Sequence, residues 1–165
     1  MNSILLEKLK TLLVERRGIS LSSDGLETIS KFNSGATVDE INSCNQYFNN
    51  LLPIEYLELL VHYNGVELFN LQDIDGFRFL DTLKIIEVNE LEKQNNSDYD
   101  PRIILFCEII GEGNYLGFRV NENGFYVILD CFHEEKPTEW RVIGYSFDDL
   151  LEKIIDEKGT KFWLG

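Results

Sequence analysis

The chain has 165 residues, of which 44% are apolar and 12% aromatic, and its 15 basic and 29 acidic side chains give a formal charge of −14. This length and apolar content fit one globular domain with a substantial core, and they exclude a disordered chain. Nucleic acids and anionic membranes would be repelled by the charge, so neither is expected as a partner. The charge favours a basic protein partner, although solubility alone would also account for it.

The three cysteines, Cys44, Cys107 and Cys131, are odd in number and far apart in the sequence. They form no CxxC pair, so neither a disulfide framework nor a structural zinc site is expected. Glu7 interrupts the N-terminal apolar run, which argues against a signal peptide, and no apolar stretch approaches the roughly 20 residues of a membrane span. We therefore expect a reduced, cytoplasmic protein that needs no metal and no cofactor.

The N-terminal part predicts one helix followed by a loop. Leu5 and Leu9 share one face of a helix expected over about residues 3–17, and Gly18 ends it. The Ser-rich stretch over residues 19–36 is predicted to be a polar connection without regular structure.

Two further helices are predicted from their end signals. Thr37 and Glu40 have the spacing of a capping box, which places a helix start there. Pro53 suits the first position of the next helix, because its missing N–H is no loss at that point. Tyr56 belongs to the apolar face of this helix, and Gly65 supplies the left-handed residue that usually follows a helix end.

The remaining sequence predicts mainly strands, with a helix over about residues 83–93 and a last helix that starts at Ser146. Asn-Gly at residues 123–124, between two alternating segments, predicts a tight hairpin. Helices followed by antiparallel strands and a closing helix indicate a single α+β domain spanning residues 1–165. The expected strands cover about residues 66–71, 77–80, 102–110, 115–120, 125–131 and 140–144.

No motif supports catalysis. The glycine run over residues 111–117 differs by one residue from a phosphate-binding loop, and it opens into a strand where such a loop must open a helix. His133 lies near Cys131 and two glutamates, but this set lacks the four ligands in defined spacing that structural zinc sites use. No Ser or Cys stands in a nucleophile pattern. A small hydrolase or a nucleotide-binding enzyme is the third and least favoured of the functions considered.

Two acidic segments, residues 73–76 and 133–139, combine negative charge with expected exposure. Each is a candidate for partner binding, with an ordinary solvated turn as the alternative. The residues that we expect to contact a partner are Asp73, Asp75, Glu112, Asn114, Tyr115, Glu134, Glu135 and Glu139.

Two segments carry a family resemblance: Leu52–Leu60 (LPIEYLELL) followed by Asn64-Gly65, and the Gly-rich residues 111–118. The first resembles the signature helix and helix end of the SUKH superfamily, and the second is similar to the Gly-rich strand turn of the same superfamily. The resemblance covers about residues 36–156 and implies an α+β domain with a central, mostly antiparallel sheet and helices packed around it. Asn45 departs from the family pattern, in which a Glu often stands there.

The resemblance also implies a function. Many bacterial members of the superfamily are immunity proteins that neutralise a toxin, often a nuclease, whereas fungal members regulate cell-wall synthesis as interaction hubs. We therefore expect stoichiometric binding to a basic toxin domain, with a regulatory or scaffold domain as the alternative. The sequence predicts neither the identity of the partner nor the oligomeric state.

Overall fold

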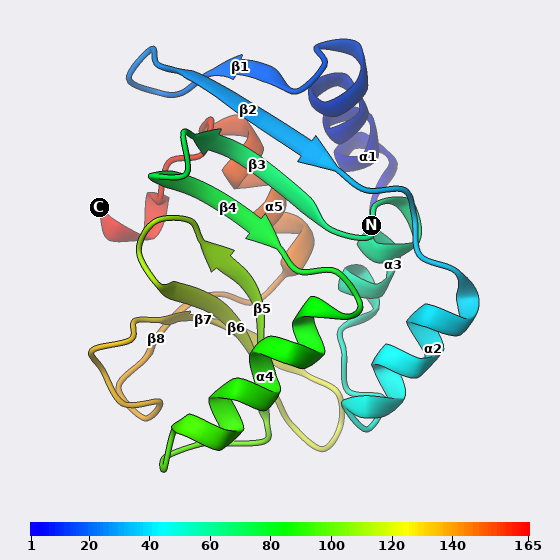
Figure 1. Ribbon diagram of the computed structural model, residues 1–165, viewed down its shortest axis with the longest axis vertical. Coiled ribbons are helices and arrows are strands. Elements are labelled where there is room, and N and C mark those ends of the chain that lie inside the picture. The colour runs from blue at the N-terminus through cyan, green and yellow to red at the C-terminus, as the bar shows by residue number, and fades with distance from the viewer.

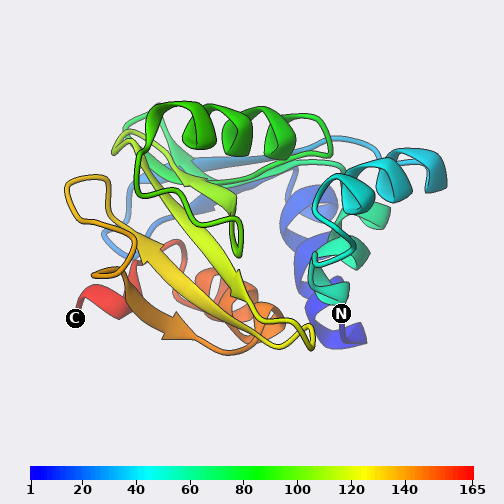
Figure 2. The same cartoon turned by 90° about the horizontal axis from the view of Figure 1, so that it is seen from below.

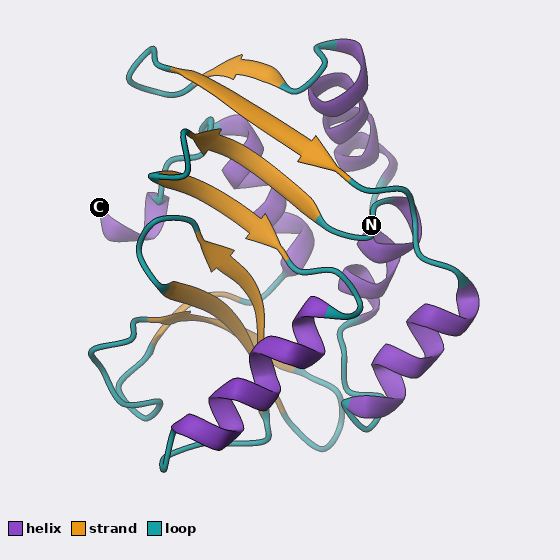
Figure 3. Ribbon diagram, viewed as in Figure 1, coloured by secondary structure: helices purple, strands orange, loops and turns teal.

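The computed structural model describes residues 1–165 as an antiparallel eight-stranded sheet with five α-helices, in the strand order β1-β2-β3-β4-β5-β6-β7-β8 (Figures 1 and 3). This architecture confirms the predicted α+β fold. The strands are β1 (Ile19–Leu21), β2 (Glu27–Phe32), β3 (Val66–Leu71), β4 (Asp75–Phe79), β5 (Ile103–Ile109), β6 (Asn114–Val120), β7 (Tyr126–Cys131) and β8 (Arg141–Gly144). The helices are α1 (Ser3–Lys10), its π-helical continuation η1 (Thr11–Glu15), α2 (Val38–Tyr47), α3 (Ile54–His62), α4 (Lys84–Asn95), α5 (Phe147–Asp156) and the 3-10 turn η2 (Phe162–Leu164).

Helices cover both faces of the sheet. Figure 2 shows α4 on one side of the strands and α5 on the other. α4 is attached to β5 by Asn89, whose side chain donates to the carbonyl of Leu105 and accepts from its N–H, both at 2.9 Å. None of the helices combines the length and the apolar character that crossing a membrane requires.

Aromatic rings fill the core between α3, α5 and the sheet. Phe106 and Phe118 stack with ring centroids 3.9 Å apart, and the ring of Phe147 from α5 packs edge-on against both. Tyr56 of α3 is completely buried, and its hydroxyl donates to the carbonyls of Leu80 at 2.5 Å and Phe106 at 3.2 Å. The predicted inward face of this helix is confirmed at Tyr56.

The predicted helix signals have the expected geometry, with small shifts in position. The capping box is present, since Glu40 N–H donates to Thr37 Oγ1 at 3.2 Å and Thr37 N–H donates to Glu40 Oε2 at 2.8 Å. Pro53 occupies the N-cap position of α3, so the first helical residue is Ile54, one residue later than predicted. Gly65 has a φ of 101°, which favours glycine, two residues after the C-cap Tyr63.

The prediction of an irregular connection over residues 19–36 was wrong, because this stretch holds β1 and β2. The inward positions of β2 are the polar Thr28 and Ser30, only 1% and 4% exposed, while Ile29 points outward and is 45% exposed. A strand with polar residues inward reverses the usual pattern and gives no recognisable signal. Hydrogen bonds satisfy the buried hydroxyls: Ser20 and Thr28 pair at 3.1 Å, and Ser30 Oγ accepts from a β3 amide at 2.9 Å.

Candidate functional site

One end of the sheet gathers the loops that follow the odd-numbered strands. Because every strand runs antiparallel to its neighbour, the connections after β1, β3, β5 and β7 must lie at the same end. Figure 1 shows all four on the side where the chain terminates. The two acidic segments predicted from the sequence, together with the β5–β6 turn, lie here. We call residues 72–75, 110–115 and 132–140 the acidic end.

A lysine from the C-terminal tail neutralises part of the acidic end. Lys161 Nζ lies 2.9 Å from an Asp75 carboxylate oxygen and also pairs with Glu112. Burial opposes the charge on Lys161, but its hydrogen bonds to Glu112 and Asp75 outweigh this effect and raise its pKa. Two predicted contact acids are therefore already paired within the protein. Sequence reasoning missed Lys161, since nothing local connects the tail to these turns.

A second tail contact holds the same segment in place. The indole N–H of Trp163 donates to Asp130 Oδ2 of β7 at 3.0 Å, and its ring packs edge-on against Phe77 of β4 at 6.0 Å between centroids. Burial raises the pKa of Asp130. The tail thus spans the sheet from β4 to β7 beside the acidic end.

Asn114 is a structural residue of this end. Its side chain is 5% exposed, and its Oδ1 accepts from the His133 backbone N–H at 3.0 Å and lies 2.6 Å from the Nδ1 of the same residue. These contacts tie the start of β6 to the β7–β8 loop. We predicted Asn114 as a contact residue, but the structure places it where it positions His133 and the loop that follows.

An acidic groove of about 420 Å³ lies between the end of α4 and the β7–β8 loop. Tyr115, Glu134 and Glu135 all line it, so the structure brings these three predicted residues together. Burial raises the pKa of the Tyr115 phenol, which stays neutral in the groove wall. Glu92 and Asp98 add two more carboxylates, while Lys136 is the one lysine or arginine of the lining. We call this cavity the acidic groove.

The carboxylates of the other two predicted acids, Asp73 and Glu139, form hydrogen bonds within their own loops. Asp73 Oδ1 accepts from the side-chain amide of Asn70 at 2.9 Å, and Glu139 Oε2 accepts from the Lys136 backbone N–H at 3.1 Å. By contrast, Glu134 lies 3.9 Å from the ring of His133 and has no closer cation, and Glu135 makes no side-chain hydrogen bond or ion pair. Glu134, Glu135 and Asp98, whose carboxylate likewise makes no hydrogen bond or ion pair, are therefore the groove acids that are free to meet a cationic partner.

None of the three cysteines is an activated nucleophile. All three cysteines are buried and free. Burial raises the pKa of the Cys44 thiol to about 12 and raises those of Cys107 and Cys131 well above their usual value, so all three are protonated at neutral pH. The groove has carboxylates to hold cations, and no cluster of three or more His, Cys, Asp or Glu residues is arranged to hold a metal ion.

Residues 35–153 match the SMI1 / KNR4 family (SUKH-1), which covers well over half of the chain. The chain belongs to the SUKH-1 family. The matched segment begins just before α2 and includes the whole acidic groove, while α1, β1 and β2 of this SUKH-1 protein precede it.

Two relatives in Bacillus subtilis (strain 168) extend beyond this segment. The chain is 24% identical over 132 residues to the uncharacterized protein YnaB, covering 80% of this chain and 85% of that protein. It is 24% identical over 168 residues to the uncharacterized protein YobM, covering 94% of this chain and 86% of that protein. The similarity to YobM therefore reaches the segments outside the family match.

Proposed function

We propose that this SUKH-1 protein is an immunity protein that neutralises a toxin by stoichiometric binding in the cytoplasm. The observation that supports this most directly is the acidic groove, where four carboxylates face one lysine and where neither Glu134 nor Glu135 pairs with a lysine or arginine of the protein. Its partner would be a basic protein domain, such as a nuclease, with neither nucleic acid nor membrane as a direct ligand.

The mechanism is occlusion of the toxin surface rather than a reaction. A protein of charge −14 attracts a basic partner over long distances, which raises the association rate. At contact, lysine or arginine side chains of the toxin would enter the acidic groove and pair with Glu134 and Glu135. Because a nuclease binds phosphates with basic residues, the same residues would then be unavailable to its substrate.

The test begins with co-expression. The C-terminal domain of the product of the adjacent upstream gene is expressed in a bacterium with and without this protein. Toxicity that co-expression relieves, together with direct binding of the two purified proteins, supports the proposal. A harmless upstream product, or toxicity that persists, would reject immunity and favour a regulatory or scaffold domain.

Charge reversal then tests the surface. Glu135→Lys at the groove is compared with Glu122→Lys, an exposed acid in the β6–β7 turn at the opposite end of the sheet. Both variants change the net charge equally, so a difference between them reports position. We expect Glu135→Lys to slow association by about tenfold and Glu122→Lys by less than about twofold. Equal effects would contradict the acidic groove as the contact surface.

A further inference from the structure

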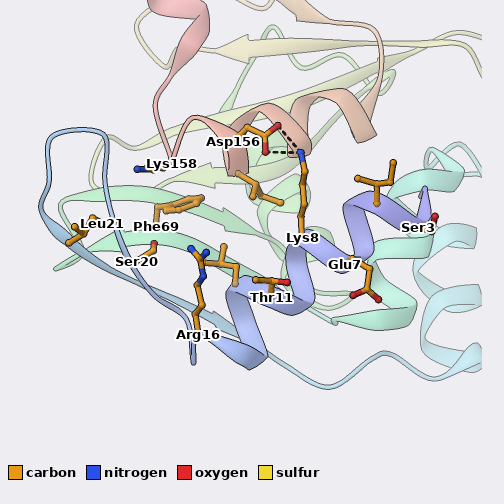
Figure 4. Close-up of a pocket in the computed structure, with 13 residues that line it drawn as sticks. Ser3, Glu7, Lys8, Thr11, Arg16, Ser20, Leu21, Phe69, Asp156 and Lys158 are labelled. Atoms are coloured by element: carbon orange, nitrogen blue, oxygen red, sulfur yellow. Dashed lines mark hydrogen bonds and ion pairs between the residues drawn. The ribbon is translucent and has the colours of Figure 1, made fainter.

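The largest cavity of the protein is separate from the acidic groove and shares no residue with it. It measures about 900 Å³ and lies between α1, β1 and the end of α5 (Figure 4). Every residue that lines it except Phe69 lies outside the family-matched residues 35–153. This cavity, which we call the α1–β1 groove, is therefore built almost entirely by residues outside the family match.

Phe69 forms part of the wall in an unfavourable backbone conformation. Its φ is 54°, in the left-handed region that a bulky residue rarely adopts. The structure holds it there from two sides: its N–H donates to Ser30 Oγ at 2.9 Å, and Gly159 packs so closely that an added Cβ would lie 2.7 Å from the Phe69 Cβ. Figure 4 shows the ring of Phe69 among the groove residues. Backbone strain of this kind is concentrated at binding sites.

The charges of the groove are unequally distributed. Lys8 is already engaged, because its Nζ lies 2.8 Å from Glu152 and 2.7 Å from Asp156. Arg16 and Lys158 line the groove and form no ion pair. Figure 4 shows both side chains close to Phe69, whereas Glu7 lies towards the other end of the groove. The Phe69 end therefore presents two uncompensated cations on a protein whose net charge is −14.

Backbone groups are also available beside the groove. β1 is the outermost strand of the sheet, so one of its edges has no partner strand. Ser20 and Leu21 of this strand line the groove, and Leu21 is 55% exposed. An unpaired strand edge next to an apolar groove accepts an extended peptide, because main-chain hydrogen bonds and side-chain contacts form together.

We propose that the α1–β1 groove binds an extended segment of a protein partner in which an apolar side chain stands next to a carboxylate. The segment adds alongside β1, its apolar side chain packs on Leu21, which is 55% exposed, and its carboxylate pairs with Arg16 and Lys158. The strand edge distinguishes a peptide from a small amphiphile, which would use only the apolar wall and the cations. This site prefers an acidic partner segment and does not depend on the function of the acidic groove.

The proposal is tested by titrating the full ¹⁵N-labelled chain with two blocked peptides, acetyl-TIFEIT-amide and acetyl-TIFKIT-amide, and with decanoate. We expect the acidic peptide to shift the amide signals of Ser20, Leu21 and Phe69, and to bind at least about tenfold more tightly than the basic peptide. No shift at these residues, equal affinity for both peptides, or binding of decanoate alone would overturn the proposal.

Variants locate the interaction without disturbing the core. Arg16→Glu with Lys158→Glu should abolish the preference for the acidic peptide, whereas the charge-matched control Lys93→Glu with Arg119→Glu, at exposed positions outside the groove, should retain it. Leu21→Asp, at a half-exposed position, should lose peptide binding while the rest of the spectrum is unchanged. A preference that survives in the Arg16/Lys158 variant would contradict the assignment of those two cations.

Discussion

At the residue scale, Tyr56 joins the helix layer to the sheet through its hydroxyl as well as its ring. The hydroxyl donates to the carbonyls of Leu80 and Phe106, which lie on separate segments and have no access to water at this point. Burial raises the pKa of the phenol well above its usual value, so it stays protonated and can donate.

Two substitutions separate the contributions of the hydroxyl and the ring. We expect Tyr56→Phe to lower the free energy of unfolding by about 1–3 kcal/mol, because the buried Leu80 carbonyl loses its side-chain donor while the Phe106 carbonyl keeps the Leu80 N–H. Tyr56→Ala should cost about 3–5 kcal/mol through the cavity that it leaves. Denaturant unfolding measures both, with Tyr145→Phe as a control at a side chain that is 77% exposed. A stable Tyr56→Ala variant would contradict the placement of α3.

Gly65 is the second residue whose identity is dictated by its surroundings. A Cβ at this position would lie 3.0 Å from Asn33 Nδ2 and 3.2 Å from the Asp81 Cβ, and its φ of 101° strains any L-residue. We expect Gly65→Val to destabilise the protein by about 1–3 kcal/mol, seen as a lower Tm. At Gly124 the φ is 80°, but an added Cβ would meet no atom within 4 Å, so Gly124→Val should lower the stability less. A Tm equal to that of the wild type in Gly65→Val would refute this account.

At the element scale, three adjacent strands are connected on one face of the sheet by the guanidinium of Arg78. Arg78 of β4 donates to Glu67 of β3 at 2.8 Å and to Glu108 of β5 at 2.7 Å. Burial disfavours the Glu67 carboxylate, but its hydrogen bonds to Asn70 and Arg78 outweigh this and lower its pKa. Its ionised form therefore stabilises the folded state.

Because of this ion pairing, the loss of folding stability caused by replacing Arg78 should depend on pH. A depressed carboxyl pKa stabilises the fold above the usual Glu value of 4.5, and the stabilisation is lost as pH falls through the folded-state pKa. Arg78→Met should therefore cost about 1 kcal/mol at neutral pH, given the partial exposure of the pair, and progressively less below that value. Unfolding curves of both proteins, measured from neutral pH to below 4.5, test this prediction. A loss of stability in Arg78→Met that does not change with pH would contradict an ionic origin of the stabilisation.

The C-terminal tail is the other element whose position depends on charge. Lys161→Met removes the cation between Asp75 and Glu112, so we expect the tail to loosen and the Trp163 fluorescence to shift to longer wavelength. Lys158→Met is the matched control, because Lys158 makes no ion pair. If the two variants gave the same spectrum, Lys161 would not be what holds the tail.

At the scale of the whole molecule, the charge of −14 has opposite consequences for folding and for association. Like charges on a compact protein repel one another, and salt screens this repulsion. We therefore expect the Tm to rise between about 20 and 200 mM NaCl, while association with a basic partner slows over the same range. Thermal unfolding and binding kinetics in one salt series measure both, and changes in the same direction would contradict a common electrostatic cause.

The sequence by itself determined the helices and the strands from β3 onwards, because caps, turn residues and apolar periodicity act over a few neighbouring residues. It also identified the acidic segments that the sheet order brings to one end. Only the tertiary structure decided that residues 19–36 hold two strands, since Thr28 and Ser30 become buried through packing that no local pattern encodes. The same holds for Lys161, which meets Glu112 from 49 positions away, and for the α1–β1 groove, whose walls come from both ends of the chain. Long-range burial and charge pairing depend on the fold as a whole, and for that reason short sequence windows do not reveal them.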